Sequence, residues 1–212
     1  MRLFVAIEAA QPWRTSALDA RRALEGGLDP AYARALRWVA PDRLHVTLSF
    51  LGEVEESRLE ALRAALDALA PTAPLSLRAT TPRMFGRPER ARVIWLALDG
   101  DTSALADLAA RADQAARASV GLEASRAPST PHLTLARVRE RASREARAAI
   151  ASAVEASATA IEPSTAVAVR RIALVRSHLE ADGPRYEVLS RHGGSTDDRE
   201  AAREVDAPEV GA

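Results

Sequence analysis

The pattern H-[VL]-T-L occurs twice in this chain of 212 residues, in "HVTLSF" at 45–50 and in "HLTLAR" at 132–137, 87 residues apart. Polar and apolar residues alternate in both stretches, as in a strand, so each histidine shares a face with the threonine two positions later. These are the only two places where a histidine precedes a threonine by two residues. One motif strand in each half permits two similar lobes that face each other.

The segments around the motifs alternate between strand-like and helix-like patterns. Short apolar runs rich in β-branched and aromatic residues predict strands at 2–8, 45–52, 131–138 and 185–192, with strand pairs within 74–100 and 164–192. Amphipathic spacing, with prolines and glycines at the ends, predicts helices at 12–27, 55–71, 101–121 and 142–158. This order indicates an α+β protein. A doubly wound dinucleotide fold is disfavoured because no glycine-rich loop follows the first strand.

The composition narrows the available chemistry. The chain has no cysteine, which excludes disulfides, thiolate nucleophiles and cysteine-based metal sites. All 29 basic residues are arginine and the formal net charge is zero, which argues against a protein that grips long duplexes by counterion release. The segment 193–212 is acidic and is expected to be disordered. The remaining body holds 27 basic and 23 acidic residues, a mild bias towards an anionic ligand.

Nothing in the sequence predicts a membrane segment. No apolar run approaches the roughly 20 residues that span a bilayer, and the apolar stretch at the N-terminus is too short for a convincing signal peptide. We therefore expect a soluble, cytoplasmic protein that acts as a monomer without an obligatory protein partner.

The paired motifs offer two imidazoles that titrate near pH ~6.5 and two neutral hydroxyl donors, with no obligatory metal. Cleavage of a phosphodiester needs this set, because one group must accept a proton from the attacking oxygen while another gives a proton to the departing oxygen. Hydroxyls can donate hydrogen bonds to the non-bridging oxygens. A single His-x-Thr is most often only the polar face of a strand, whereas the repetition favours one shared site. His178 and His192 lack the pattern and are expected to be exposed to solvent.

At this point the chain resembles the two-histidine phosphoesterase superfamily, and within it the bacterial RNA 2',3'-cyclic phosphodiesterases, often labelled 2'-5' RNA ligases. The resemblance covers nearly the whole body of the chain. It is carried by "MRLFVAIE", "RWVAPDRLHVTLSFLGEV", "MFGRPERARVIWLAL", "PHLTLAR" and "LVRSHLEADGPRYEVL". The paired motifs at this separation are specific, although each motif alone is weak.

The resemblance implies two pseudo-symmetric lobes of mainly antiparallel sheet, with helices on the outer faces and a central cleft. It implies one two-lobed domain over 1–192, followed by the acidic tail 193–212. By the same resemblance His45 is the proton donor and His132 the proton acceptor, while Thr47 and Thr134 hold the phosphate oxygens. No cofactor or metal is implied. The expected partners are RNA 3' ends or small cyclic nucleotides, and the expected product is a phosphomonoester, a 2'-phosphate.

Two further residues are candidates for substrate binding. Arg137 could bind phosphate through two guanidinium donors, and Phe50 could stack on the terminal base or serve as a core aromatic. In a straight strand, however, both point away from the face of the histidines, so each reaches the cleft only if its strand ends, twists or bulges. Trp38 and Trp95 are assigned to the core. The loop arginines are expected to form a solvated surface rather than an RNA path: Arg83, Arg87, Arg90 and Arg92.

Three alternatives remain open at this stage. The same pair of histidines could join RNA ends through a 2'-5' linkage by the reverse transesterification. The chain could instead be a module that binds nucleotides or RNA ends without turnover. A zinc hydrolase would need a third ligand beside the histidines, and no H-E-x-x-H helix is present.

Overall fold

Strand β1 (Arg2–Glu8) lies near the middle of one large antiparallel sheet. The computed structural model describes residues 1–69, 71, 73–123, 125, 130–180 and 183–194, so most of the predicted acidic tail lies outside the described residues. Within the described part the sheet has nine strands in the order β7-β4-β5-β6-β3-β1-β8-β9, and β2 also pairs with β6. The remaining strands are β2 (Leu36–Trp38), β3 (His45–Glu53), β4 (Leu75–Phe85), β5 (Val93–Gly100), β6 (Leu133–Val138), β7 (Val167–Val169), β8 (Arg171–Glu180) and β9 (Gly183–Gly193).

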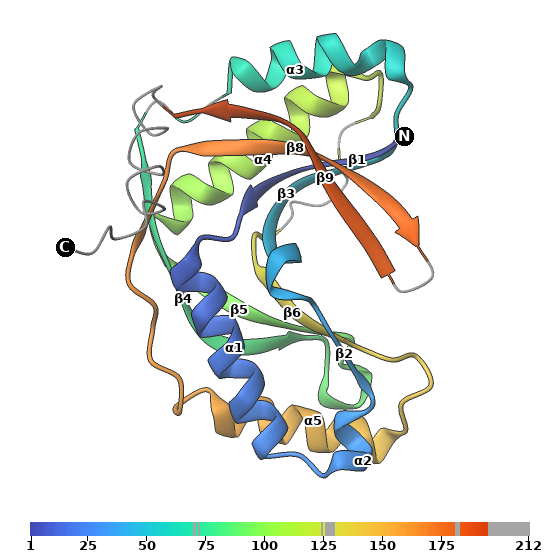
Figure 1. Cartoon of the computed structure of the whole chain (residues 1–212), viewed down its shortest axis with the longest axis vertical. Coiled ribbons are helices and arrows are strands. Elements are labelled where there is room, and N and C mark those ends of the chain that lie inside the picture. Colours follow the sequence, from blue (N-terminus) through green and yellow to red (C-terminus); the bar gives the residue numbers. More distant parts are fainter. Residues whose placement is uncertain (70, 72, 124, 126–129, 181–182, 195–212) are drawn as a thin grey trace, which may run out of the picture.

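The sheet narrows where β3 meets β6. Their register contains a single residue pair, Val46 with Leu133, whereas the strands β1 and β3, and likewise β8 and β9, pair over most of their lengths. Two halves meet at this junction: β3, β1, β8 and β9 on one side, and β6, β5, β4 and β7 on the other. Figure 1 shows that the sheet curls, so that the two halves form a half-barrel around an open side. The predicted fold class, helices on the outer faces of a mainly antiparallel sheet, is confirmed.

Each half is covered by its own pair of helices. Helices α3 and α4 pack on one another and on the half that contains β3, while α1 and α5 pack on one another and on β4 (Figure 1). The helices and 3-10 turns are α1 (Gln11–Gly26), α2 (Pro30–Ala33), η1 (Pro41–Arg43), η2 (Glu56–Arg58), α3 (Leu59–Asp67), η3 (Pro88–Arg90), α4 (Thr102–Ser119) and α5 (Arg144–Ser157). The sequence prediction missed α2 and β2, which are too short to show a periodic pattern. In the described residues no helix is both long and apolar enough to cross a bilayer.

The main apolar core lies between the sheet and these helices. Strand β1 shows how the chain divides its residues: Leu3, Val5 and Ile7 join the main core, whereas Phe4 and Ala6 join a small cluster on the other face of the sheet. Both faces of β1 are therefore covered, which explains why the run from Leu3 to Ile7 is buried throughout. The small cluster lies on the concave face of the half-barrel, beside the motif histidines.

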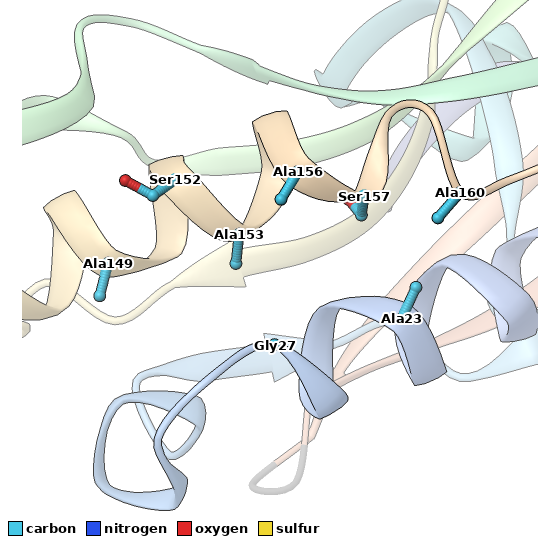
Figure 2. Close-up of a pocket in the computed structure, with 8 residues that line it drawn as sticks. All are labelled: Ala23, Gly27, Ala149, Ser152, Ala153, Ala156, Ser157 and Ala160. Atoms are coloured by element: carbon cyan, nitrogen blue, oxygen red, sulfur yellow. The ribbon is translucent and has the colours of Figure 1, made fainter.

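A groove between α1 and α5 is explained by packing alone. Figure 2 shows small side chains of the two helices facing one another across it, including Ala23 of α1 and Ala153 of α5. The groove has a volume of about 470 Å³, and its walls are alanines, serines and a glycine. It contains no group that could act as an acid, a base or a charged ligand, so we assign it no function.

Candidate active site

The junction between the two halves of the sheet brings the motif histidines together. His45 is the first residue of β3, and His132 immediately precedes β6. The pair between Val46 and Leu133 is antiparallel, so an approximate twofold axis passes through it. That axis exchanges His45 with His132 and Thr47 with Thr134. The histidine that begins each motif therefore lies near the threonine of the other.

The two imidazoles are held by matching backbone hydrogen bonds. His45 Nδ1 lies 2.8 Å from the carbonyl oxygen of Arg43, and His132 Nδ1 lies 2.7 Å from that of Thr130. A carbonyl oxygen only accepts, so Nδ1 must carry the proton in each ring. Each neutral ring consequently presents an unprotonated Nε2, ready to accept a proton, and each charged ring presents Nε2–H, ready to donate one.

Aromatic rings bracket each histidine in the same manner. The centroid of the His45 ring lies 4.9 Å from Phe4 and 5.2 Å from Tyr186. In the other half, the His132 ring lies 4.8 Å from Phe85 and 5.6 Å from Trp95. These contacts fix the plane of each ring and exclude water from one side of it. The pseudo-symmetry of the motifs thus extends to the residues that support them.

Burial and positive charge lower the pKa of both histidines. Burial is the largest cause for His45, opposed by the Arg43 carbonyl and reinforced by the charges of His132 and Arg137. For His132 burial again lowers the pKa most, the Thr130 carbonyl opposes it, and Arg137 lowers it further. The positive charge of Arg137 therefore acts on the pKa of both rings.

A pocket of about 250 Å³ opens beside His45 and Thr47. It is walled by Arg2, Phe4, Phe50, Arg137, Ser177, Leu179, Pro184 and Tyr186 in addition to those two residues. The pocket combines two arginines, three hydroxyl-bearing side chains of the sheet and several aromatic rings. Such a lining suits an anionic group attached to a flat, apolar ring. Over the described residues no group of three or more His, Asp or Glu side chains could hold a metal ion.

Phe50 reaches this pocket because β3 contains a β-bulge. The β1–β3 register pairs Val5 with Ser49 and Ala6 with Thr47, so Leu48 is an extra residue without a partner. Leu48 and Ser49 are both buried, after which Phe50 emerges on the face of His45 and is 45% exposed. Strand parity predicted that Phe50 reaches the cleft only if its strand ends, twists or bulges, and this bulge meets that condition because one inserted residue reverses the alternation.

Arg137 reaches the pocket because β6 also contains a β-bulge. The β5–β6 register pairs Ile94 with Ala136 and Trp95 with Thr134, which leaves Leu135 as the extra residue. Leu135 and Ala136 are both buried and Arg137 is exposed. The condition predicted for Arg137, that its strand must end, twist or bulge, is met here as well. Because each motif carries its bulge at the same position, the sixth residue of each quoted stretch joins the histidine and threonine on one face.

A polar network from α4 holds the bulge of β3. The buried hydroxyl of Ser49 donates to Asp113 Oδ1 at 2.7 Å, and Arg117 Nε donates to the same oxygen at 2.9 Å. Arg117 also donates to the carbonyl oxygen of Phe50 at 3.1 Å. Burial raises the pKa of Asp113, but hydrogen bonds from Ser49, Ser125 and Arg117 outweigh it, so the net pKa is lowered. The ionised carboxylate therefore fastens the segment before Phe50.

Several residues of the site were not predicted individually. Arg2, Phe4, Ser177 and Tyr186 line the pocket, although the quoted stretches of the resemblance contain all four. The alternation of side chains along a strand does not distinguish these residues: it assigns the aromatic side chains of Phe4 and Tyr186 to an apolar core. Arg2 also lies over the Phe50 ring, with its guanidinium carbon 4.9 Å from the ring centroid.

Other predictions need correction. The assignment of Trp95 to the core is wrong, because it is only half-buried, stacks on Phe85 at 4.8 Å and contacts His132. Trp38 is partly buried and does pack against the main core. The prediction that His192 is exposed is wrong, because it is 3% exposed and bonded to Asp67 and Ser190. His178 is half-buried and paired with Glu187. The four loop arginines predicted to be solvated are exposed: Arg83, Arg87, Arg90 and Arg92.

Comparison with known proteins agrees with this geometry. The family model described as LigT-like phosphoesterase matches residues 16–95 and 98–186. The chain belongs to the LigT-like phosphoesterase family. The matched segments contain both histidine motifs and Tyr186, whereas Arg2 and Phe4 of the pocket lie before the first matched segment.

Curated relatives of this LigT-like phosphoesterase are named RNA 2',3'-cyclic phosphodiesterase. One from Geobacillus stearothermophilus is 30% identical over 154 residues, which is 72% of this chain but 46% of the relative. The chain thus spans about half the length of that protein. Another, from Methanothermobacter thermautotrophicus, is 27% identical over 71% of this chain and 78% of its own.

Solved structures show the same fold. A protein of Thermus thermophilus superposes with a TM-score of 0.70 at 27% identity and covers 91% of this chain and 97% of its own. E. coli LigT in complex with 3'-AMP superposes with a TM-score of 0.66 at 28% identity, and the superposition covers 92% of this chain and 98% of LigT. The E. coli protein has also been solved with phosphate.

Proposed function

We propose that this LigT-like phosphoesterase hydrolyses the 2',3'-cyclic phosphate at RNA 3' ends by general acid–base catalysis between His45 and His132. The observation that carries the proposal is the matching pair of Nδ1 hydrogen bonds to backbone carbonyls, which leaves both Nε2 atoms for proton transfer. The names of the curated relatives support the substrate, and the half-barrel shared with LigT supports the placement of the site.

In the proposed reaction His132 is neutral and His45 is protonated. Water attacks phosphorus and gives a proton to His132 Nε2, while the bond from phosphorus to the ribose O3' breaks. His45 Nε2–H protonates that departing oxygen, which leaves a terminal 2'-phosphate. The two histidines have then exchanged protonation states, and solvent restores them. The resemblance to two-histidine phosphoesterases supports this assignment of roles, because the two rings are otherwise nearly equivalent by pseudo-symmetry.

The other pocket residues have roles in binding. We propose that Thr47 and Thr134 donate hydrogen bonds to the non-bridging phosphate oxygens and that Arg137 offsets their charge. Phe50 is exposed beside Arg2 at the outer end of the pocket, where a terminal base could stack on it. The proposed ligand is therefore an RNA 3' end or a small cyclic nucleotide, recognised by its phosphate and by one base.

The test uses an RNA oligonucleotide that ends in a 2',3'-cyclic phosphate, incubated with the protein in EDTA. The wild type should release no mononucleotide but convert the end to a phosphomonoester, identified as 2' or 3' against synthetic standards. His45→Ala and His132→Ala should each lose about 100- to 10,000-fold in rate. His178→Ala is the matched control, because that imidazole pairs with Glu187 and does not line the pocket.

Full activity in either motif variant would contradict the proposed mechanism. Tight binding of the oligonucleotide without turnover would indicate a binding module instead. Because the same groups can catalyse the reverse transesterification, incubation with a second RNA bearing a free 5'-hydroxyl shows whether a 2'-5' linkage also forms.

A further inference from the structure

A second, strongly basic cavity lies beside Glu8, the strand partner of His45. It has a volume of about 580 Å³ and is walled by β7, the end of β1 and the start of β8, with Glu8, Arg170, Arg171 and Arg191 as its charged residues. This volume is within the range of roughly 300–1,000 Å³ typical of small-molecule sites. The reaction proposed above uses none of these residues.

The register places three of the four charged residues of the cavity on the face of the active site. Glu8 is the direct partner of His45 across β1 and β3. Ala6 pairs with Ala173 of β8, and Ala173 pairs with Arg191 of β9. Ala6 and Ala173 belong to the small cluster on the concave face. Arg191 shares that face because it pairs with Ala173. Glu8 and Arg171 share it too, because each lies two residues along its strand from Ala6 or Ala173.

Positive charge in the cavity exceeds what its one carboxylate can balance. Arg191 donates two hydrogen bonds to Glu8, at 2.6 and 2.8 Å. The bond from Arg191 is the main cause that lowers the Glu8 pKa, and the charges of Arg171 and Arg14 lower it further. Arg170 and Arg171 are exposed, and over the described residues neither makes a hydrogen bond or salt bridge. Two guanidinium groups are therefore available for an anion.

We propose that this cavity binds a second phosphate of the substrate, a backbone phosphate of the RNA next to the cyclic end, through Arg170 and Arg171. The inference rests on the proposed function for the source of the phosphate. Neighbouring strands lie about 4.8 Å apart and β8 is two strands from β3, so the arginines lie about 10 Å from His45. A phosphate held between the histidines does not reach that far, whereas the next phosphates of the same strand do.

The experiment measures binding of RNAs that end in a 3'-phosphate and cannot turn over. A nucleoside 3'-monophosphate, which has no backbone phosphate, and an octanucleotide are titrated by fluorescence anisotropy over a series of salt concentrations. Arg171→Ala should weaken octanucleotide binding about tenfold and reduce the slope of log K against log salt by about 0.7. Binding of the mononucleotide should be unaffected. Glu8→Gln should tighten octanucleotide binding, because it releases Arg191.

Arg111→Ala is the matched control, since Arg111 is exposed on α4 and pairs with Asp107. Circular dichroism confirms that each variant is folded. Equal octanucleotide affinity in Arg171→Ala and Arg111→Ala would overturn the proposal. Tripolyphosphate is titrated in parallel: if its binding alone depends on Arg171, the cavity serves a free polyphosphate and the RNA source is overturned. Because these ligands do not react, the binding result can be interpreted even if the protein does not hydrolyse a cyclic phosphate.

Discussion

Val46 and Leu133 are register partners across β3 and β6, and each directly follows a motif histidine. This pair is the seam at which two halves of the sheet meet, each with its own helices. Because the pairing is antiparallel, the seam relates the two motifs by an approximate twofold axis. The active site is consequently assembled from parts of the chain that are far apart in sequence, and its two imidazoles have nearly equivalent surroundings.

The pH dependence of the reaction should reflect the lowered pKa of both histidines. Catalysis requires one neutral and one protonated ring, so kcat/KM passes through a maximum between the two apparent pKa values of the free enzyme. Burial lowers both below the ordinary ~6.5, so the optimum of kcat/KM should lie below pH ~6.5. Bound phosphate favours the charged rings, and the optimum of kcat should be higher. A kcat/KM optimum above pH ~7.5 would contradict this account.

Replacing Arg137 should change both binding and the pH profile. Its positive charge lowers the pKa of His45 and His132, so Arg137→Gln should raise both values and move the kcat/KM optimum to higher pH. KM should rise about tenfold through loss of the phosphate contact. Arg137→Lys keeps the charge but loses the paired donors, so it should raise KM with little change in the optimum. An unshifted optimum in Arg137→Gln would show that the guanidinium is not near the rings.

Removing the carboxylate of Asp113 should loosen the bulge that presents Phe50. Asp113→Ala leaves the hydroxyl of Ser49, which is 2% exposed, without its partner, and should cost about 1–3 kcal/mol of stability. The pKa of Asp113 is lower in the folded protein than in the unfolded chain, where it is ~3.9. The contribution of its carboxylate to stability is therefore fully present above pH ~3.9 and is lost as the pH falls through the pKa of the folded state. Urea unfolding at pH 7 and at pH 3 measures the difference in the free energy of unfolding between wild type and variant, and this difference should be smaller at pH 3. KM for a cyclic mononucleotide should also rise, and Asp107→Ala on the same helix is the control.

His192 should matter for stability and not for the reaction. Its ring lies between α3 and β9, with Nδ1 at 2.6 Å from Asp67 Oδ1 and Nε2 at 2.8 Å from Ser190 Oγ. His192→Ala removes a buried ring and two hydrogen bonds, so we expect a loss of about 1–3 kcal/mol and a Tm lower by several degrees. His178→Ala should change stability by less than about 1 kcal/mol, because its ion pair is at the surface. A fall in kcat for His192→Ala at a temperature where it is folded would assign it an unexpected role in the reaction.

Much of the fold follows from local patterns in the sequence. The spacing of Trp13, Ala17, Ala20 and Leu24 defines the buried side of α1 without reference to any other segment. The repeated H-[VL]-T-L likewise identifies the two strands of the site, because a histidine and a threonine two residues apart share a face in any strand. The alternation of strands and helices indicates the α+β class. These inferences depend on periodicity, which is a property of neighbouring residues.

What periodicity could not supply is the effect of one strand on another. Phe50 and Arg137 point into the pocket only because β1 and β5 leave Leu48 and Leu135 without partners, and an unpaired residue is visible only in the register of two strands. Similarly, the sequence pattern around Trp95 is that of a core residue, and only the fold shows its contacts with Phe85 and His132. The burial of His192 likewise depends on a distant segment, because its ring is bonded to Asp67 of α3. The residue pattern alone identifies the histidines and threonines that we propose carry the chemistry. The face that they share is set by the folded sheet, because facing is a relation between strands that are distant in the chain.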